Sequence, residues 1–180
     1  MRRFEAAPWS TALRLVSFLG AGVLLAVGVT VGRAIPLGSG PAFAEAVARL
    51  VLPAAVLTLL GSLLFVVTGY HLEGTSLLVH RPLWQSRIDV QGLERVWHDP
   101  EAMRRSLRLF GNGGLFSITG LYRNSTLGTY RAFVTDPARA VVLRSPARVV
   151  VVSPASPLEF VSHVATLVPG VAVGPSPRRV

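Results

Sequence analysis

Two long segments of the chain carry no formal charge: LVSFLGAGVLLAVGVTVG at residues 15–32 and LVLPAAVLTLLGSLLFVVTGY at residues 50–70. Helices of these lengths would be about 27 and 31 Å long, close to the hydrocarbon thickness of a bilayer. Neither segment has the polar face of a helix that packs on a soluble core. Their side-chain polar atoms are hydroxyls, which can bond to the helix's own carbonyls. The segments therefore predict two membrane-spanning helices.

The start of each predicted span needs a separate argument. Pro53 lies near the start of the second segment, where its missing N–H costs little, so it indicates a helix start. For the first segment a cleaved signal peptide is the competing interpretation, because Arg2 and Arg3 precede it and Ala42-Phe43-Ala44 has a small-x-small pattern. That tripeptide lies ten residues beyond Gly32, and the apolar run is long for a signal core. A retained span is therefore favoured.

The arginines predict the orientation, because positive residues near span ends are retained in the cytoplasm. Five of them flank the hairpin and two lie between its spans: Arg2, Arg3, Arg14, Arg81 and Arg87, against Arg33 and Arg49. We therefore expect a multi-pass protein of the cell (inner, cytoplasmic) membrane with both termini in the cytoplasm. Residues 1–14 would be a cytoplasmic segment, residues 15–70 the two spans with a short outer loop, and the remainder a cytoplasmic domain.

Composition limits the possible functions. The formal net charge is +9, all 18 basic residues are arginines, and there is no cysteine. Residues 71–180 contain 13 arginines and seven acids, a net charge of +6, which would attract anionic headgroups or nucleic acid. These arginines are scattered among predicted strands rather than stacked on one helix, so we expect no nucleic-acid partner. Without cysteine there are no disulfides, thiol catalysis or cysteine zinc sites.

After residue 70 the hydrophobic period changes from helical to alternating, with turn residues every 8 to 12 positions, as is typical of a β-rich domain. Seven strands are predicted, at residues 76–81, 83–90, 105–110, 115–122, 129–134, 140–144 and 149–152, with a less regular stretch at 91–103. Gly111-Asn112-Gly113-Gly114 can supply positive φ without strain. This tetrad predicts a tight hairpin turn between the third and fourth strands.

One helix closes the predicted domain. Ser156-Pro157-Leu158-Glu159 has the residues of a capping box, with an N-cap serine, a proline at the first helical position and a glutamate three residues after the cap. Apolar residues then recur every three or four positions to Val168, which predicts a stripe packed on the sheet. Pro169-Gly170 ends the helix, and we expect residues 169–180 to be a disordered tail.

Seven antiparallel strands followed by one amphipathic helix is the order of the pleckstrin-homology (PH)-like barrel. The stretch from His71 to about Leu167 resembles the bacterial PH domains found on membrane-anchored proteins. The resemblance is carried by SLRLFGNGGLF at 106–116, GLYRN at 120–124, LGTY at 127–130, TDP at 135–137 and VSP at 152–154. It implies an α+β, mainly β domain at residues 71–168, a seven-stranded PH-like barrel capped by the C-terminal helix and preceded by the two-helix transmembrane hairpin.

The resemblance does not extend to lipid recognition. The chain lacks the basic pattern that eukaryotic PH domains use for phosphoinositides on their first hairpin, and its last helix has no tryptophan. Catalytic motifs such as HExxH or G-x-S-x-G are absent, and the four histidines are isolated from one another in the sequence. We therefore expect no enzyme activity, no cofactor and no metal.

The densest basic group is the candidate contact surface. Arg104, Arg105 and Arg108 would contact anionic lipid or a partner, and Arg104 and Arg108 would share one face of an extended strand. A solvated strand face is the competing interpretation, and it is the one that the strand pattern favours.

Together these features predict a non-enzymatic, membrane-anchored interaction or scaffold module at the cytoplasmic face. Its partners would be the lipid bilayer and an unidentified protein or a second copy of the chain. A sensor of anionic lipid surfaces and an accessory subunit of a membrane transport or secretion assembly are the alternatives. Spans without a charged residue argue against autonomous transport.

Overall fold

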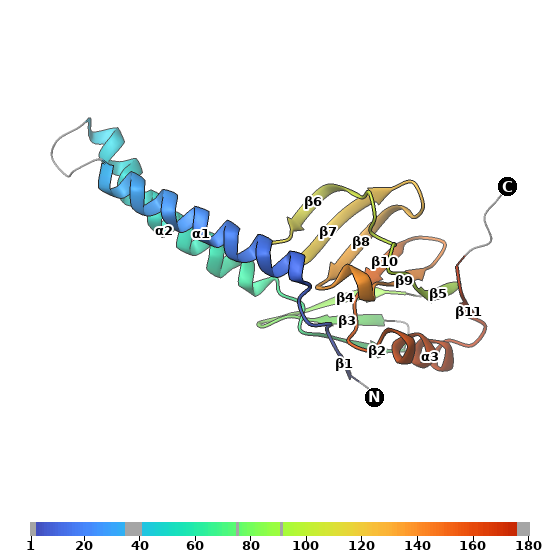
Figure 1. Ribbon diagram of the computed structural model, residues 1–180. Helices are drawn as coiled ribbons and strands as arrows, with labels where there is room; N and C mark the ends of the chain where they lie inside the picture. Colours follow the sequence, from blue (N-terminus) through green and yellow to red (C-terminus); the bar gives the residue numbers. More distant parts are fainter. Residues whose placement is uncertain (1–2, 35–40, 75, 91, 176–180) are drawn as a thin grey trace.

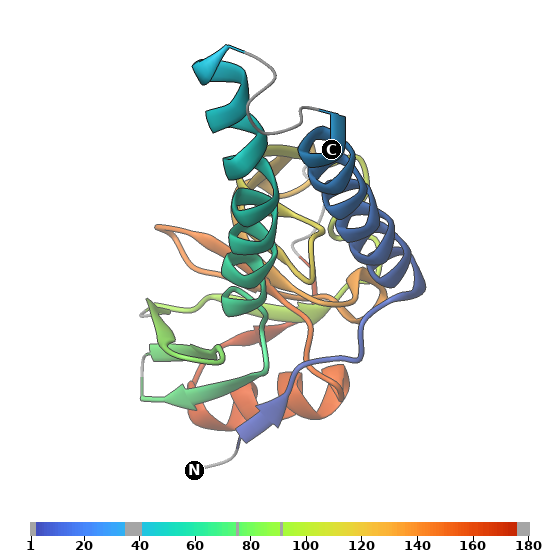
Figure 2. The same cartoon turned by 90° about the vertical axis from the view of Figure 1, so that its left-hand side faces the viewer.

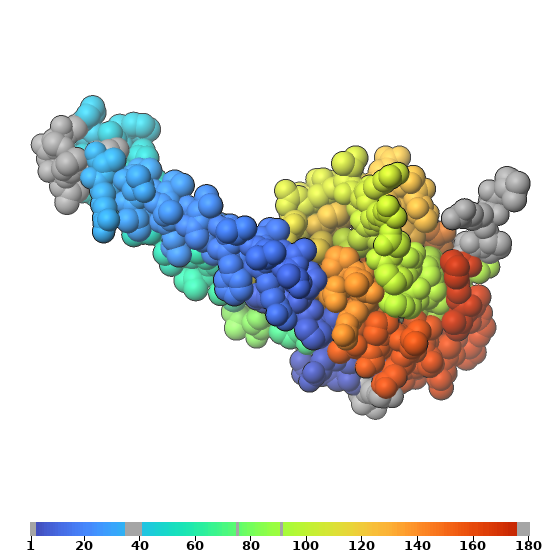
Figure 3. Space-filling view, viewed as in Figure 1, coloured from blue at the N-terminus to red at the C-terminus, as the bar shows by residue number. Residues whose placement is uncertain are grey.

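A computed structural model describes residues 3–34, 41–74, 76–90 and 92–175 of the chain. Two long helices, α1 (Thr11–Ala34) and α2 (Ala42–Leu64), project side by side from one end of a strand-rich domain (Figure 1). Both are long and apolar enough to cross a membrane, and the rest of the structure buries only 11% of each apolar window. The space-filling view shows most of the helix pair standing clear of the domain (Figure 3).

Helices form over both charge-free segments, but the second helix has different ends from the predicted ones. α2 begins eight residues before its segment and ends six residues before the segment does. Pro53 therefore lies inside α2 and not at its start. The added N-terminal turns contain the ion pair Glu45–Arg49, 3.5 Å apart at i,i+4, which is the favourable order of charges on a helix. At the other end the chain becomes extended, and Tyr70 lies in a strand.

The strands form two sheets. The smaller sheet has the order β1-β2-β3-β4, with bounds Arg3–Glu5, Gly69–Glu73, Ser76–His80 and Gln85–Asp89. The larger sheet has the order β11-β5-β9-β10-β8-β7-β6, with bounds Ala172–Val173, Arg95–His98, Val141–Arg144, Val149–Val152, Gly128–Val134, Ile118–Asn124 and Leu107–Gly113. The pairs β10–β8 and β11–β5 are parallel, and the other pairs are antiparallel.

The predicted closed barrel of seven strands is wrong in strand number and in closure. Among the described residues, β1, β2, β5 and β11 are strands that the alternation pattern does not predict. β4 pairs only with β3 and β6 only with β7, so within the described ranges no hydrogen-bond ladder closes the structure between these two edges. The result is two packed sheets with an opening at the β6 end.

Both ends of the chain contribute to the domain. β1 places Phe4 opposite Tyr70 of β2, and Phe4 is buried in the core, so the N-terminal segment is part of the domain although two helices separate it from β2. At the other end Ala172 pairs with Arg95. This pairing contradicts a tail that is disordered from residue 169. Residues 176–180, the rest of that predicted tail, lie outside the described residues.

The core has two parts, because successive residues of a strand point to opposite faces of the sheet. Val150 and Val152 of β10 pack between the sheets with α3 (Pro157–Leu167), whereas Val151 packs on the other face with Trp97. We call the face of the larger sheet that meets the smaller sheet the inner face. Figure 2 shows the sheets behind the two helices, with α3 at the bottom of the view.

The closing helix is confirmed, but its predicted cap is not. Ser156 is the N-cap residue of α3, and its side chain makes no capping hydrogen bond. The first helical bond runs instead from the Phe160 N–H to the Ser156 carbonyl oxygen, at 3.0 Å. Phe160 is fully buried and lies edge-on to Phe4, with ring centroids 5.1 Å apart. Burial of this stripe, rather than the serine hydroxyl, therefore places the helix.

The turn after β6 packs on α1. The buried Ser17 hydroxyl accepts from the Phe116 N–H at 2.8 Å and donates to the Gly114 carbonyl oxygen at 3.0 Å. The expectation that hydroxyls bond within their own helix holds for Thr58 and Ser62, which donate to carbonyls of α2. Ser17 instead joins a helix to the sheet domain.

The predicted hairpin turn at residues 111–114 is displaced along the chain. β6 continues through Gly113, and the connection to β7 follows it. Asn112 shapes this connection, because its Oδ1 accepts from the N–H groups of Gly114 (3.3 Å) and Leu115 (3.0 Å). The asparagine side chain thus shapes a connection that differs from the tight hairpin turn predicted at residues 111–114.

Candidate functional site

The three arginines singled out from the sequence do not lie on one strand face. Arg104 and Arg105 precede β6, in a turn where Arg105 has φ +52°, and only Arg108 is in the strand. Arg104 and Arg108 line a hollow of about 540 Å³ beside Tyr122. Arg105 is not among the described residues that line it. Glu101 lines the same hollow, and its Oε2 lies 2.9 Å from Arg104 Nη1. We call this the outer hollow.

A β-bulge separates Arg108 from the opposite face of the sheet. The register shifts between Arg108 and Phe110, so that Arg108 pairs with Tyr122 and Phe110 with Leu121. Neighbouring residues of β7 point to opposite faces, so the bulge at Leu109 turns Phe110 toward the inner face and leaves Arg108 on the other. Regular alternation would have put both on one face.

The inner face is uncovered at β6 and β7, and a groove of about 750 Å³ opens there against the C-terminal end of α2. We call it the junction groove. Its lining includes Phe65, Arg81, Phe110, Leu121, Arg131 and Phe133. The inner face is covered over β5, β9, β10 and the Phe133 end of β8, but Phe110 is 79% exposed and Leu121 38% exposed. The groove is therefore the open end of the space between the two sheets.

Arg81, which directly follows β3, is held firmly at this opening. Its Nη1 donates to the Phe65 carbonyl oxygen at 2.9 Å and its Nε donates to Ser86 Oγ at 3.2 Å. Its guanidinium carbon lies 5.3 Å from the centroid of the Phe65 ring and 5.6 Å from that of Phe133. Burial, and then the positive charge of Arg131, lower the pKa of Arg81. The group is nevertheless a fixed cation, since arginine stays protonated in proteins.

Arg131 of β8 is the second cation of the junction groove. Its guanidinium carbon lies 5.8 Å from the same Phe133 ring. Within the described ranges no carboxylate forms a salt bridge with Arg81 or Arg131. A guanidinium has five N–H donors, of which Arg81 uses two on the protein. The two guanidinium groups lie at the same Phe133 ring and form no salt bridge with a described carboxylate. This arrangement favours the binding of an anion between Arg81 and Arg131.

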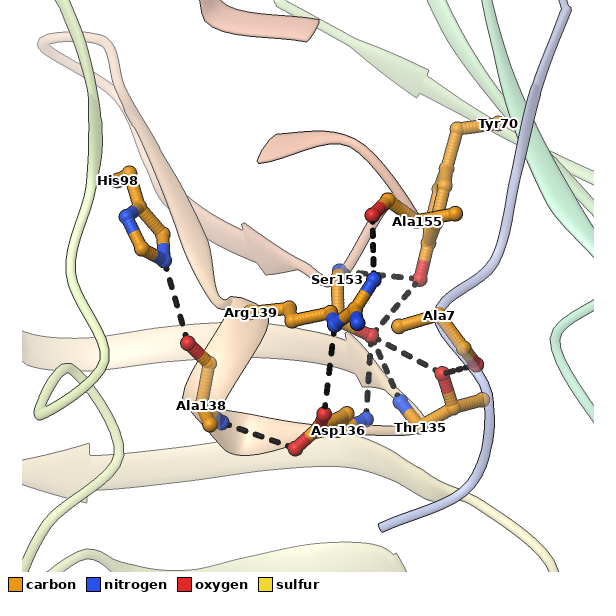
Figure 4. Close-up of polar contacts among 9 residues, drawn as sticks. All are labelled: Ala7, Tyr70, His98, Thr135, Asp136, Ala138, Arg139, Ser153 and Ala155. Carbon is orange, nitrogen blue, oxygen red and sulfur yellow. Dashed lines mark hydrogen bonds and ion pairs between the residues drawn. The ribbon is translucent and has the colours of Figure 1, made fainter. Parts of the chain in front are cut away.

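A second polar cluster lies where β8 and β10 end (Figure 4). Ser153 Oγ accepts from the Thr135 N–H at 2.8 Å, and Thr135 Oγ1 donates to the Ala7 carbonyl oxygen at 2.7 Å. The Tyr70 hydroxyl accepts from the Ser153 N–H at 3.1 Å and donates to the Phe133 carbonyl oxygen at 2.6 Å. Burial raises the pKa of Tyr70 to about 12. These bonds join the N-terminal segment to the sheets.

This polar cluster has no catalytic geometry. The His98 ring nitrogen Nε2 lies 3.2 Å from the Ala138 carbonyl oxygen and does not face Ser153 or Asp136 (Figure 4). Without a base on the serine, the nucleophile and acid–base arrangement of a hydrolase is not formed. Among the residues that the structure describes, no group of three or more metal-binding side chains comes together.

The sequence pattern contained one signal for the junction groove. On β8, Arg131 shares the inner face with the exposed Thr129 and the buried Phe133, and an arginine next to a large apolar residue on one strand face is a sign of a special environment. Arg81 carried no such signal, because it follows its strand and reaches Phe133 only in the folded chain.

Two apolar helices attached to a two-sheet β domain with a closing helix define a PH-like module that carries a helical hairpin. A family model described as a bacterial PH domain matches residues 68–167, which run from just before β2 to the end of α3. The chain therefore belongs to the bacterial PH domain family. No curated protein and no solved structure matches the chain. PH domains are generally interaction modules without catalytic activity.

Proposed function

We propose that the protein is a non-enzymatic interaction or scaffold module, which α1 and α2 anchor in the cell membrane with the PH-like domain at the cytoplasmic face. The exposed apolar surface of the two helices supports this, because a surface of that size in water would favour aggregation. The far ends of the helices carry Arg33 and the Glu45–Arg49 pair, as expected for ends that reach water.

The observation that carries the proposal is that the domain forms hydrogen bonds at the domain-side ends of both helices. The turn after β6 bonds to Ser17 of α1. Directly after α2, the Phe65 carbonyl oxygen accepts from Ser117 Oγ at 3.1 Å and from Arg81 Nη1 at 2.9 Å. With the helices in a bilayer, the domain therefore rests against the membrane surface rather than on a free linker.

A protein partner, or a second copy of the chain, would bind at a free sheet edge. β6 is one such edge, and it exposes Leu107, Leu109 and Phe110. Edge strands with exposed apolar residues are ready to pair with another strand. An accessory role in a membrane transport or secretion assembly would use the same surface.

The test is the topology in intact cells. The chain has no cysteine, so single cysteines at Ser10, Ser39 and Ser125 can be labelled with an impermeant maleimide without background. Ser125 is exposed in a turn of the domain, and Ser39 lies between the helices, outside the described residues. Only the Ser39 variant should react in intact cells, and all three should react after permeabilisation. Labelling of the Ser125 variant in intact cells would refute the orientation, and release of the chain by alkaline washing would refute the anchoring.

A further inference from the structure

The lengths of the helices place the junction groove at the level of the lipid headgroups. α1 has 24 residues and is about 36 Å long, whereas the hydrocarbon core of a bilayer is about 30 Å thick. The excess of about 6 Å corresponds to one helical turn, so the first turn of α1, up to Arg14, lies in the headgroup region. Ser17 and Gly20 contact the turn that leads from β6 to β7, and a side-chain carbon on Gly20 would lie 3.5 Å from Leu115. Because Ser17 and Gly20 follow the first turn of α1, the β6–β7 turn reaches through the headgroups to the edge of the hydrocarbon, and the strands that line the groove lie at the membrane surface.

The groove is also continuous with the surface of α2. Gly61, Ser62 and Phe65 form one of its walls, at the end of the helix and just beyond it. Gly61 has no neighbouring atom within 4 Å of the position that a side chain would take, so this wall is open. A lipid that lies against α2 can enter the groove without leaving its leaflet.

The two ends of the groove differ in chemistry. Arg81 and Arg131 are cations without an acidic partner in the described structure, and they have N–H donors to spare. Phe110 and Leu121 expose apolar side chains that an aqueous ligand would leave in water. A ligand that fits both ends has a phosphate at one end and a hydrocarbon chain at the other.

We propose that the junction groove binds one anionic phospholipid of the cytoplasmic leaflet, with its phosphate on Arg81 and Arg131 and an acyl chain against Phe110 and Leu121. Planar guanidinium groups bind phosphate oxygens through pairs of parallel hydrogen bonds. The outer hollow is the weaker candidate, because Glu101 already neutralises Arg104 there. The proposal rests on the proposed membrane anchoring, since the lipid enters from the bilayer.

The experiment uses the full chain, purified in a neutral detergent and reconstituted into phosphatidylcholine nanodiscs. A trace of phosphatidylglycerol with a fluorescent acyl chain is titrated in, and its binding to the protein is measured by energy transfer from the tryptophans. The Arg81→Gln/Arg131→Gln variant should bind the probe at least about tenfold more weakly. Each arginine near the membrane surface strengthens the binding of an anionic lipid by roughly fivefold, and this variant lacks two of them. The matched control, Arg104→Gln/Arg108→Gln, removes the same charge from the outer hollow and should stay within about threefold of the wild type.

A single Arg131→Gln variant guards against misfolding, because Arg131 is exposed and its side chain makes no hydrogen bond or salt bridge among the described residues. It should show a loss that is smaller than that of the double variant but larger than that of the control. Wild-type binding by both groove variants, or an equal loss in the control, would overturn the proposed lipid site. Alkaline washing of membranes that contain these variants separates the two proposals. A chain that stays in the membrane but binds the probe like the wild type refutes the lipid site alone, whereas a chain that washes off refutes the anchoring.

Discussion

The Ser17 hydroxyl and the Phe116 amide are 99 positions apart in the sequence and 2.8 Å apart in the structure. Ser17 is completely buried, and its hydroxyl also donates to the Gly114 carbonyl oxygen. One hydroxyl within the charge-free run of α1 therefore satisfies two backbone groups of the sheet domain. This contact places the domain relative to the helical hairpin, and with it the junction groove.

Replacing Ser17 with alanine should loosen this contact. The Phe116 N–H and the Gly114 carbonyl oxygen would lose their partner, at a cost of about 1 to 3 kcal/mol for buried polar groups. Hydrogen exchange of the full chain in detergent micelles should show faster exchange at the Phe116 amide. Thr58→Ala is the matched control, because that hydroxyl bonds only to the Ala54 carbonyl oxygen of its own helix. Unchanged exchange at Phe116 would mean that the hydroxyl does not hold the turn.

Packing between the two helices can be tested at a pair of glycines in α1. A side-chain carbon on Gly28 would lie 3.1 Å from the Cα of Leu52 in α2, whereas one on Gly22 would have no atom within 4 Å. Gly28→Val should therefore push the helices apart and lower the unfolding free energy by about 1 to 3 kcal/mol. Gly22→Val adds the same side chain to the same helix and should have little effect on packing. Equal melting temperatures of the two variants in detergent would contradict the observed helix pair.

Stability should fall at alkaline pH because of Tyr70. Its pKa is about 12 in the folded protein and about 10 in the unfolded chain, so the folded state binds the phenolic proton more tightly. The stabilisation is complete below pH 10 and is lost as the pH rises toward 12, with a total of about 2 to 3 kcal/mol. Burial also raises the pKa of Tyr122 and Tyr130, so they act in the same direction.

The Tyr70→Phe variant isolates this contribution. It should be less stable than the wild type at neutral pH, because the Phe133 carbonyl oxygen and the Ser153 N–H lose their partner. Its stability should then decline less between pH 10 and 12. Chemical denaturation at a series of pH values measures both effects. Parallel stability curves for wild type and variant would show that Tyr70 does not titrate with folding.

The closing helix offers a test of packing against capping. Phe160→Ala should cost about 3 to 5 kcal/mol, because it empties a fully buried site next to Phe4 and Tyr70. Ser156→Ala should cost less than the ~1 kcal/mol typical of a lost N-cap, because its side chain makes no capping bond. Thermal melting of the full chain compares them. A loss of unfolding free energy above ~1 kcal/mol in Ser156→Ala would support the capping box that the sequence pattern predicted.

Local patterns were sufficient wherever the structure depends on near neighbours in the sequence. The charge-free runs predicted two helices, and α3 follows from an apolar stripe with a period of three to four residues. The strands from β6 to β10 lie close to their predicted places, since alternation and turn residues are read over a few positions. The family resemblance was equally local, because it was carried by short motifs, and a family match over residues 68–167 confirms it.

Those local patterns could not predict which strands distant in the sequence pair with each other. Nothing near Phe4 indicates that it pairs with Tyr70 across two intervening helices, and β11 is too short to have a period of its own. The same limit explains the predicted barrel. Strand order and closure depend on which edges meet, and here β4 and β6 do not.

By itself the sequence determined the two long apolar helices, the class of the domain and the family, because each depends on composition, a short repeat or short motifs. Only the tertiary structure decided the candidate site. The bulge at Leu109 sends Arg108 and Phe110 to opposite faces, which a period of two cannot anticipate. Arg81 and Arg131, 50 positions apart, meet at the Phe133 ring because β8 of one sheet packs beside the end of β3 in the other. A binding surface made of separate strands exists only once the sheets have packed.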